Sequence, residues 1–137
     1  MGWYSYVKAI QDALKEKLTD LSSFGGRVYL DYWTSIKEFP ALRLIFQRDD
    51  TSPSTGSLDV HYLTFQVEVL YRGRATEEDK NKLMEYTGEV VDALLSDREL
   101  ACACENLEVT RVDLGHRVSE SMILHYALIT IVVRKLW

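Results

Sequence analysis

The sequence has little of what several classes of protein depend on. Its 137 residues include only two cysteines, Cys102 and Cys104, and the single residue between them disfavours a structural disulfide, so we expect a reducing compartment. The chain has 16 basic and 21 acidic residues, a formal charge of −5, which argues against a protein that neutralises nucleic-acid phosphates with a basic face. The three histidines, His61, His116 and His125, form no metal-ligand spacing.

The sequence also lacks a secretion signal and a membrane segment. Residues 1–8 have neither the basic region nor the long apolar region of a signal peptide. The most apolar stretch, Ser121–Arg134, is interrupted by polar residues and is shorter than the roughly 20 apolar residues that a membrane span needs. With 47% apolar and 27% charged residues, the composition is that of a globular protein, and the length predicts one domain, residues 1–137. We expect a cytosolic protein with no membrane association.

What the sequence does contain is a strong strand pattern at Ser121–Arg134. The stretch has no glycine or proline and is rich in β-branched residues. Its two alternating sets of side chains are both largely apolar, so we expect cover on both faces. His125 lies on this strand and is interpreted as a hydrogen-bonded core or interface histidine. Two helices can cover only one face of a sheet, so sheet curvature or a neighbouring subunit would have to close the other.

The remaining elements follow from hydrophobic periodicity and capping residues. Apolar residues spaced three and four apart predict a first helix, and a hydroxyl followed by three acidic residues predicts the start of a second. Alternation and β-rich composition predict the strands. The predicted elements are a helix at Trp3–Leu21, strands at Arg27–Trp33, Ala41–Arg48 and Leu58–Arg72, a helix from Thr76 to about Arg98, and strands at Leu107–Leu114 and Ser121–Arg134. The order α-β-β-β-α-β-β indicates an α+β fold with a mostly antiparallel sheet and both helices on one face.

Two further predictions concern a change in the apolar pattern of one strand and the turn before the last strand. Within Leu58–Arg72 the apolar residues are even-numbered as far as Tyr62 and odd-numbered from Leu63 onward. A β-bulge or strong bend near Tyr62 would reconcile the two halves. The stretch Gly115–Ser119 is predicted to turn the chain into the last strand.

Between two of these strands, Asp49–Ser57 contains only turn-forming or small polar residues and is predicted to be a long loop. Long loops often make contacts, so this one is a candidate contact arm. Its acids could also bind calcium, but they lack the regular ligand spacing of a calcium loop and are read as solvated. The partner-contact candidates in the arm are Asp49, Asp50, Thr51, Ser52 and Pro53.

Three aromatic residues near the chain ends are further partner-contact candidates. The candidates are Trp3 and Tyr4 on the first helix and Trp137, which closes the chain. Trp3, Tyr4 and Tyr6 span more than one face of that helix and cannot all enter its buried stripe. Exposed aromatic rings of this size favour interfaces, with ordinary packing within the subunit as the alternative.

No combination of residues indicates an active site. The cluster Glu77–Asp79 is explained by its place at a helix N-terminus, and Cys102 and Cys104 lack a second Cys/His pair for a soft metal. No catalytic, cofactor-binding or metal-binding residue is therefore predicted, and the chain is expected not to be an enzyme.

Taken together, several features resemble the small tail-terminator, or tail-completion, proteins of long-tailed bacteriophages and related prophage particles. They are the leading amphipathic helix, the Phe39–Pro40 entry into a strand, the polar arm before a long strand ending Tyr71-Arg-Gly-Arg74, the second helix and the final hairpin. The resemblance lies in element order, size and texture over nearly the whole chain. No matched motif assigns individual lumen or tube-contact residues.

The resemblance implies an α+β subunit in a hexameric ring that caps the head-proximal end of the tail tube and ends tube polymerisation. The implied partners are other copies of the chain, the tail tube protein, neck or connector proteins, and DNA that passes through the lumen without specific binding. The implied location is the tail–neck junction of the virion, after assembly in the host cytoplasm. Two alternatives stay open, namely a neck or head–tail connector protein of the same particle, and a small α+β enzyme or ligand-binding module.

Overall fold

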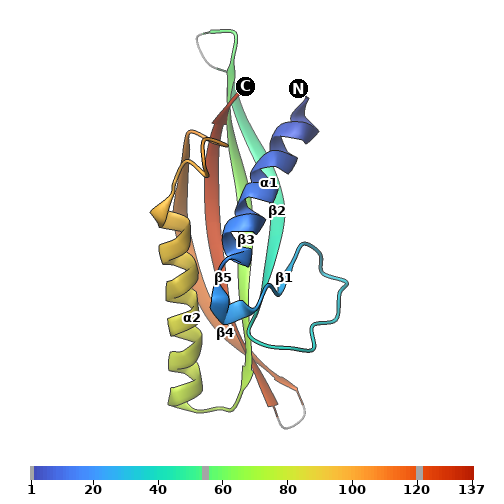
Figure 1. Ribbon diagram of the computed structural model, residues 1–137, viewed down its shortest axis with the longest axis vertical. Helices are drawn as coiled ribbons and strands as arrows, with labels where there is room; N and C mark the ends of the chain where they lie inside the picture. The colour runs from blue at the N-terminus through green and yellow to red at the C-terminus, as the bar shows by residue number, and fades with distance from the viewer. Residues whose placement is uncertain (1, 54–55, 120–121) are drawn as a thin grey trace.

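The computed structural model describes residues 2–53, 56–119 and 122–137. In these residues an α+β domain is built from two helices, one short 3-10 turn and one five-stranded sheet (Figure 1). The elements in chain order are α1 Trp3–Thr19, η1 Ser22–Phe24, β1 Val28–Tyr29, β2 Ala41–Pro53, β3 Asp59–Gly73, α2 Glu77–Ser96, β4 Asn106–Ser119 and β5 Met122–Leu136. The predicted order α-β-β-β-α-β-β is confirmed.

The sheet has the strand order β1-β2-β3-β5-β4. All neighbouring strands are antiparallel except β1, which pairs in parallel with β2 through Val28 and Tyr29 alone. Helices α1 and α2 lie side by side on the same face, as predicted (Figure 1). Both long hairpins, β2–β3 and β4–β5, therefore present one face to the helices and the other away from them.

Each helix follows from its sequence pattern. In α1, apolar residues spaced three and four apart form a single buried stripe, Val7, Ile10, Leu14 and Leu18. In α2, the Thr76 hydroxyl accepts a hydrogen bond from the Asp79 backbone N–H at 3.2 Å, which confirms the predicted N-cap. The two helices end at Thr19 and Ser96, each about two residues before the predicted C-terminal end.

The core lies between the helices and one face of the sheet. Its central rows are the odd-numbered residues of the two middle strands, where each fully buried aliphatic side chain contributes about 1.5–3 kcal/mol. These residues are Leu63, Phe65, Val67 and Val69 on β3 and Ala127, Ile129, Ile131 and Val133 on β5. Burial on β5 therefore alternates, and the even-numbered residues that face away from the helices are only partly covered. Of the strand predicted at Ser121–Arg134, Ser121 lies outside the described residues.

The predicted bulge near Tyr62 is wrong. Odd-numbered residues of β3 face the core from His61 onward, and Leu58 and Tyr62 are 48% and 40% exposed. The register shift lies on the neighbouring strand, between Phe46 and Arg48 of β2. The even-numbered apolar residues near the start of β3 suggested that the buried face changes there. Apolar residues indicate the buried face of a strand only where other elements cover that strand.

Three boundaries also differ from the predictions. Strand β1 has only two residues, because the chain leaves the sheet edge after Tyr29. The predicted turn at Gly115–Ser119 is a continuation of β4, in which Gly115 lies against the Tyr126 ring across the ladder. The predicted loop at Asp49–Ser57 is wrong as far as Pro53, because β2 keeps pairing with β3 up to the pair Pro53–Asp59. Polar residues are tolerated there because β2 has no neighbouring strand on its outer side beyond Arg43.

Candidate functional site

The predicted contact arm is the far end of the β2–β3 hairpin, and both chain ends lie beside it (Figure 1). The C-terminal residue is fixed there by two backbone hydrogen bonds, from Asp59 N to Trp137 O at 2.9 Å and from Trp137 N to Asp59 O at 3.1 Å. Two residues of the arm, Ser54 and Thr55, lie outside the described residues. This end of the molecule thus gathers the sequence-predicted candidates from three separate parts of the chain.

Asp49 is the centre of this region. Its carboxylate accepts hydrogen bonds from Trp3 Nε1 at 2.8 Å, from the Thr51 hydroxyl at 3.0 Å and from His61 Nδ1 at 2.7 Å. The Asp49 side chain is 9% exposed and that of His61 8%, so the pair is nearly removed from solvent. The interpretation of Asp49 as a solvated loop acid is therefore wrong.

The surroundings of Asp49 hold its carboxyl group in the charged form. Burial acts to raise the pKa, but the hydrogen bonds from His61, Trp3 and Thr51 outweigh it and lower the pKa below its usual value. An ionised carboxylate only accepts hydrogen bonds, so His61 carries a proton on Nδ1. Among the described residues, no hydroxyl or thiol bonds to the other ring nitrogen, Nε2, as a nucleophile activated by an aspartate–histidine pair would.

Trp137 completes the arrangement by stacking. Its ring lies parallel to that of His61, with centroids 3.3 Å apart and an interplanar angle of 4°, and to that of Tyr6, at 4.7 Å and 14°. Lys135 Nζ lies 5.9 Å from the Tyr6 ring centre. We call the six residues Trp3, Tyr6, Asp49, Thr51, His61 and Trp137 the terminal cluster. It joins α1, β2, β3 and the chain end, and so fixes the base of the projecting hairpin.

The structure brings together four of the eight predicted contact residues, namely Trp3, Asp49, Thr51 and Trp137. The other four remain on the surface near the same end of the sheet or the start of α1. Tyr4 is 69% exposed, and Asp50 forms an exposed ion pair with Arg48 at 3.0 Å. Ser52 and Pro53 are exposed on the last residues of β2. The surface available to a partner at this end is therefore the hairpin and the outer side of the first helical turn.

Two members of the terminal cluster, Tyr6 and His61, are absent from the predicted contact residues. His61 could have been found by extending the odd-numbered alternation of Leu63 and Phe65 backward along the strand. The stacking of Tyr6 on Trp137 joins positions 131 residues apart and leaves no local pattern.

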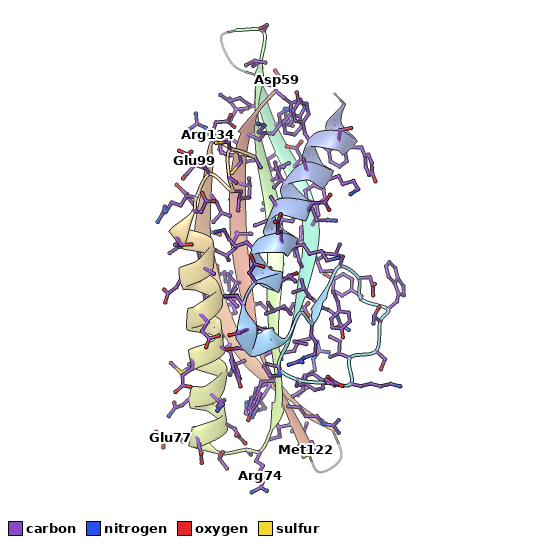
Figure 2. The ribbon with its side chains drawn as sticks, viewed as in Figure 1. Asp59, Arg74, Glu77, Glu99, Met122 and Arg134 are labelled. Atoms are coloured by element: carbon purple, nitrogen blue, oxygen red, sulfur yellow. The ribbon has the colours of Figure 1, made fainter. Side chains whose placement is uncertain are left out.

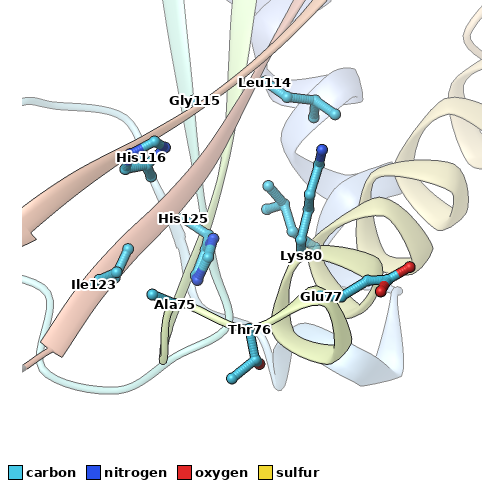
Figure 3. A pocket seen from close by; sticks show the side chains of 10 residues that line it. Ala75, Thr76, Glu77, Lys80, Leu114, Gly115, His116, Ile123 and His125 are labelled. Carbon is cyan, nitrogen blue, oxygen red and sulfur yellow. The ribbon is translucent and has the colours of Figure 1, made fainter.

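A second feature is a groove of about 610 Å³ between the start of α2 and the β4–β5 hairpin (Figure 3). At its base His125 is 7% exposed, and its Nε2 is 2.7 Å from the Arg74 carbonyl oxygen, which confirms the predicted hydrogen-bonded histidine. The groove is lined by Ala75, Thr76, Glu77, Lys80, Leu83, Leu114, Gly115, His116, Ile123 and His125.

The two cysteines differ in their surroundings. Cys102 is exposed, whereas Cys104 is buried, and burial raises the pKa of its thiol to about 11. Within residues 2–53, 56–119 and 122–137, no group of three or more His, Cys, Asp or Glu side chains could hold a metal ion. In the same residues, neither helix is both long and apolar enough to cross a membrane.

Comparison with known proteins finds a likeness among solved structures. No family model matches the sequence, and no curated protein matches it. Among solved structures, a similar chain occurs in one described as "Virion of native gene transfer agent (GTA) particle". The two chains are 14% identical, superpose with a TM-score of 0.51, and match over 96% of this chain and 98% of that one. At this identity the likeness establishes a shared fold over nearly the full length of both chains.

Proposed function

We propose that this chain is a structural protein of a phage-like virion and has no catalytic activity. The observation that carries the proposal is the end-to-end likeness to a chain of a gene transfer agent virion, a phage-like particle. The likeness extends over 96% of this chain and 98% of that one, so it is not confined to one part of either. The aspartate–histidine pair fits this role, because it bonds to the first helix and stacks on the chain end.

Within such a particle, we propose that the chain is a tail terminator. It would form a hexameric ring at the head-proximal end of the tail tube, end tube polymerisation and present a surface to the neck proteins. Assembly in the host cytoplasm would place it at the tail–neck junction of the virion. Partly exposed apolar residues on the helix-free face of β5, such as Leu124, Leu128 and Val132, support a role in assembly, because a neighbouring subunit could cover them.

The charge of the chain supports the passage of DNA through such a ring. The formal charge is −5, and the exposed side of α2 carries Glu78, Glu85, Glu89 and Asp92. An acidic surface repels phosphates, so DNA could move past without binding.

Mass in solution tests the ring. Multi-angle light scattering of the chain, alone and with purified tail tubes, should show an assembly of about 95 kDa, six times the subunit mass of 15.8 kDa. The assembly should be found either free in solution or as mass added to the tubes. Negative-stain images should show the chain at one end of each tube, and growing tubes should stop lengthening when it is added. A chain that stays monomeric and leaves tubes unchanged would contradict the proposal. A neck connector would bind tube ends or neck proteins without stopping tube growth.

We also propose that the tip of the β2–β3 hairpin makes ring or tube contacts, because Ser52 and Pro53 are exposed there and follow the terminal-cluster residues Asp49 and Thr51 along β2. Replacing Ser52–Leu58 with a two-residue turn would remove the tip and keep Asp49 and His61. The shortened chain should fold with normal stability and lose ring formation or tail-length control. Unchanged assembly would refute this part of the proposal.

A further inference from the structure

The most exposed large aromatic residue among those described is Trp33, with 87% of its surface accessible. It lies in residues 30–40, the segment between β1 and β2, which we call the Trp33 loop. The Asp31 carboxylate accepts hydrogen bonds from the backbone N–H groups of Trp33 and Thr34, at 2.9 and 2.7 Å, and from the Thr34 hydroxyl at 3.1 Å. These bonds hold the backbone around the exposed ring in a fixed turn.

The Trp33 loop is also fastened to the sheet. Arg43 Nη2 donates to the Thr34 carbonyl oxygen at 2.8 Å, and Arg27 Nε donates to the Pro40 carbonyl oxygen at 2.9 Å. An exposed tryptophan on a fastened loop loses little conformational freedom on binding. Such residues are frequent energetic centres of interfaces.

A fitting surface lies at the opposite edge of the sheet, in the groove between α2 and β4. Its apolar lining includes Ala75, Leu83, Leu114 and Ile123, and Leu114 is 44% exposed at the open side. Its volume of about 610 Å³ lies in the range of small-ligand pockets, roughly 300–1,000 Å³, and is ample for an indole ring.

The acids of the Trp33 loop already have partners, since Asp31 bonds within the loop and Glu38 lies 3.8 Å from Arg27, and the remaining charged groups of the two surfaces could pair with each other. The Lys80 side chain lies along the groove, where its ammonium group could meet the face of an inserted indole ring (Figure 3). Glu77 lies at the groove margin, and the Trp33 loop carries Lys37. Among the described residues, none of these three side chains takes part in an ion pair or a side-chain hydrogen bond. A cation–π contact and one ion pair could therefore form without breaking existing bonds.

The two surfaces belong to opposite edges of one sheet. The Trp33 loop follows β1, at one end of the order β1-β2-β3-β5-β4, and the groove borders β4, at the other end. Figure 1 shows the loop on the far side of the sheet from α2. The loop that carries Trp33 thus lies at the other edge of the sheet from the groove of its own subunit. A contact that joins one edge of a subunit to the other edge of the next is heterologous, and its repetition closes a ring when the rotation allows.

We propose that Trp33 of one copy inserts into the α2–β4 groove of the next copy and forms the repeating contact of the ring. This inference rests on the proposed ring and names its interface. The partner is a second copy of this chain, and the contact is directional, with Trp33 on one side and the groove on the other.

Two variants test the two sides of this contact one at a time. Trp33→Ala removes the inserted ring and keeps the groove, and Leu114→Arg blocks the groove and keeps the ring. Each alone should fold, as checked by circular dichroism, and should lose ring formation with subunit association weakened about 30-fold or more. Mixed in equal amounts, they should form pairs of about 32 kDa, twice 15.8 kDa, because one intact contact remains and cannot repeat. Met84→Ala is the control, since it removes an exposed apolar side chain from α2 that does not line the groove, and it should assemble like the natural chain.

Each outcome decides between the two proposals. If both variants form rings as well as the natural chain, the interface is wrong and the ring proposal stands. If the natural chain forms pairs or open chains that Trp33→Ala abolishes, the interface stands and the ring proposal fails. If the natural chain shows no self-association at millimolar concentration, with or without tail tubes, both are wrong. A Lys80→Glu variant repeats the groove test if Leu114→Arg does not fold, and it should weaken association in the same direction.

Discussion

Replacing Asp49 with alanine should destabilise the subunit, because the terminal cluster depends on this one carboxylate. The change removes the acceptor of three hydrogen bonds, from Trp3 Nε1, Thr51 and His61 Nδ1. Trp3 is 46% exposed, so water can replace the lost partner of its indole N–H. The His61 side chain is 8% exposed, and among the described residues its Nδ1 would keep only the Thr51 hydroxyl, at 3.1 Å.

The magnitude follows from these contacts. Hydrogen bonds to a charged group contribute about 1.5–3 kcal/mol each, and a buried donor without its partner costs about 1–3 kcal/mol. Removing a buried carboxylate also recovers part of the free energy needed to desolvate it, so the three losses do not add. We expect Asp49→Ala to lower the free energy of unfolding by about 2–3 kcal/mol, which for a chain of this length corresponds to a Tm lower by roughly 7–10 °C.

Urea denaturation at pH 7, followed by tryptophan fluorescence and by circular dichroism, measures this change. The midpoint should fall while the slope of the transition stays the same, as for a loss of native-state contacts. Asp50→Ala is the matched control, because its carboxylate makes, within the described part of the chain, only an exposed ion pair with Arg48, and it should change the free energy of unfolding by less than about 0.5 kcal/mol. Equal effects of the two substitutions would refute the reasoning, because the buried network would then contribute no more than a surface ion pair.

Three further predictions concern other parts of the chain. The hydrogen bonds that lower the pKa of Asp49 contribute stability that is present above the unfolded-state pKa of about 3.9 and is lost as the pH falls through the lower folded-state pKa. The difference in the free energy of unfolding between the natural chain and Asp49→Asn should therefore shrink as the pH falls below about 3.9, and a difference that grows below that pH would contradict the assignment. A thiol reagent at pH 8 should label the exposed Cys102 in the native protein and Cys104, with its pKa of about 11, only after unfolding, as counted by mass spectrometry. Gly115→Ala should destabilise by about 1–3 kcal/mol, because a Cβ there would overlap the tyrosine ring across the ladder, whereas Gly88→Ala on α2 meets open space and should stabilise by up to about 1 kcal/mol in the same urea assay.

Much of the fold was predictable because its signals are local. The apolar stripe of α1 and the capping residues of α2 lie within a few residues of one another, so the helices can be read without knowing what they pack against. The long strand β3 follows from alternation over its buried part, and β5 follows from a run of β-branched residues without glycine or proline. These patterns were sufficient to predict an α+β domain with both helices on one face of the sheet.

Prediction from the sequence failed where a strand continues beyond the elements that cover it. Residues such as Asp49 and Gly115 have turn-forming character, and both lie in strands because the neighbouring strand continues to pair with them. The apparent change of phase at Tyr62 has the same origin, since apolar residues at the uncovered end of β3 do not mark the core face. Pairing with a distant strand overrides local preference at these positions.

The sequence by itself determined the helices, the central strands and the presence of aromatic and acidic residues near the chain ends. Only the tertiary structure decided what those residues do. Asp49 meets partners at positions 3 and 61, and Trp137 stacks on rings at positions 6 and 61, because the sheet brings the start of α1, the β2–β3 hairpin and the chain end together. Trp33 was predicted to lie in a strand from the composition of Arg27–Trp33. Its side chain is exposed instead, because strand pairing at the sheet edge ends after Tyr29. Local periodicity is encoded over a few residues, whereas these contacts join distant positions and exist only once the sheet has formed.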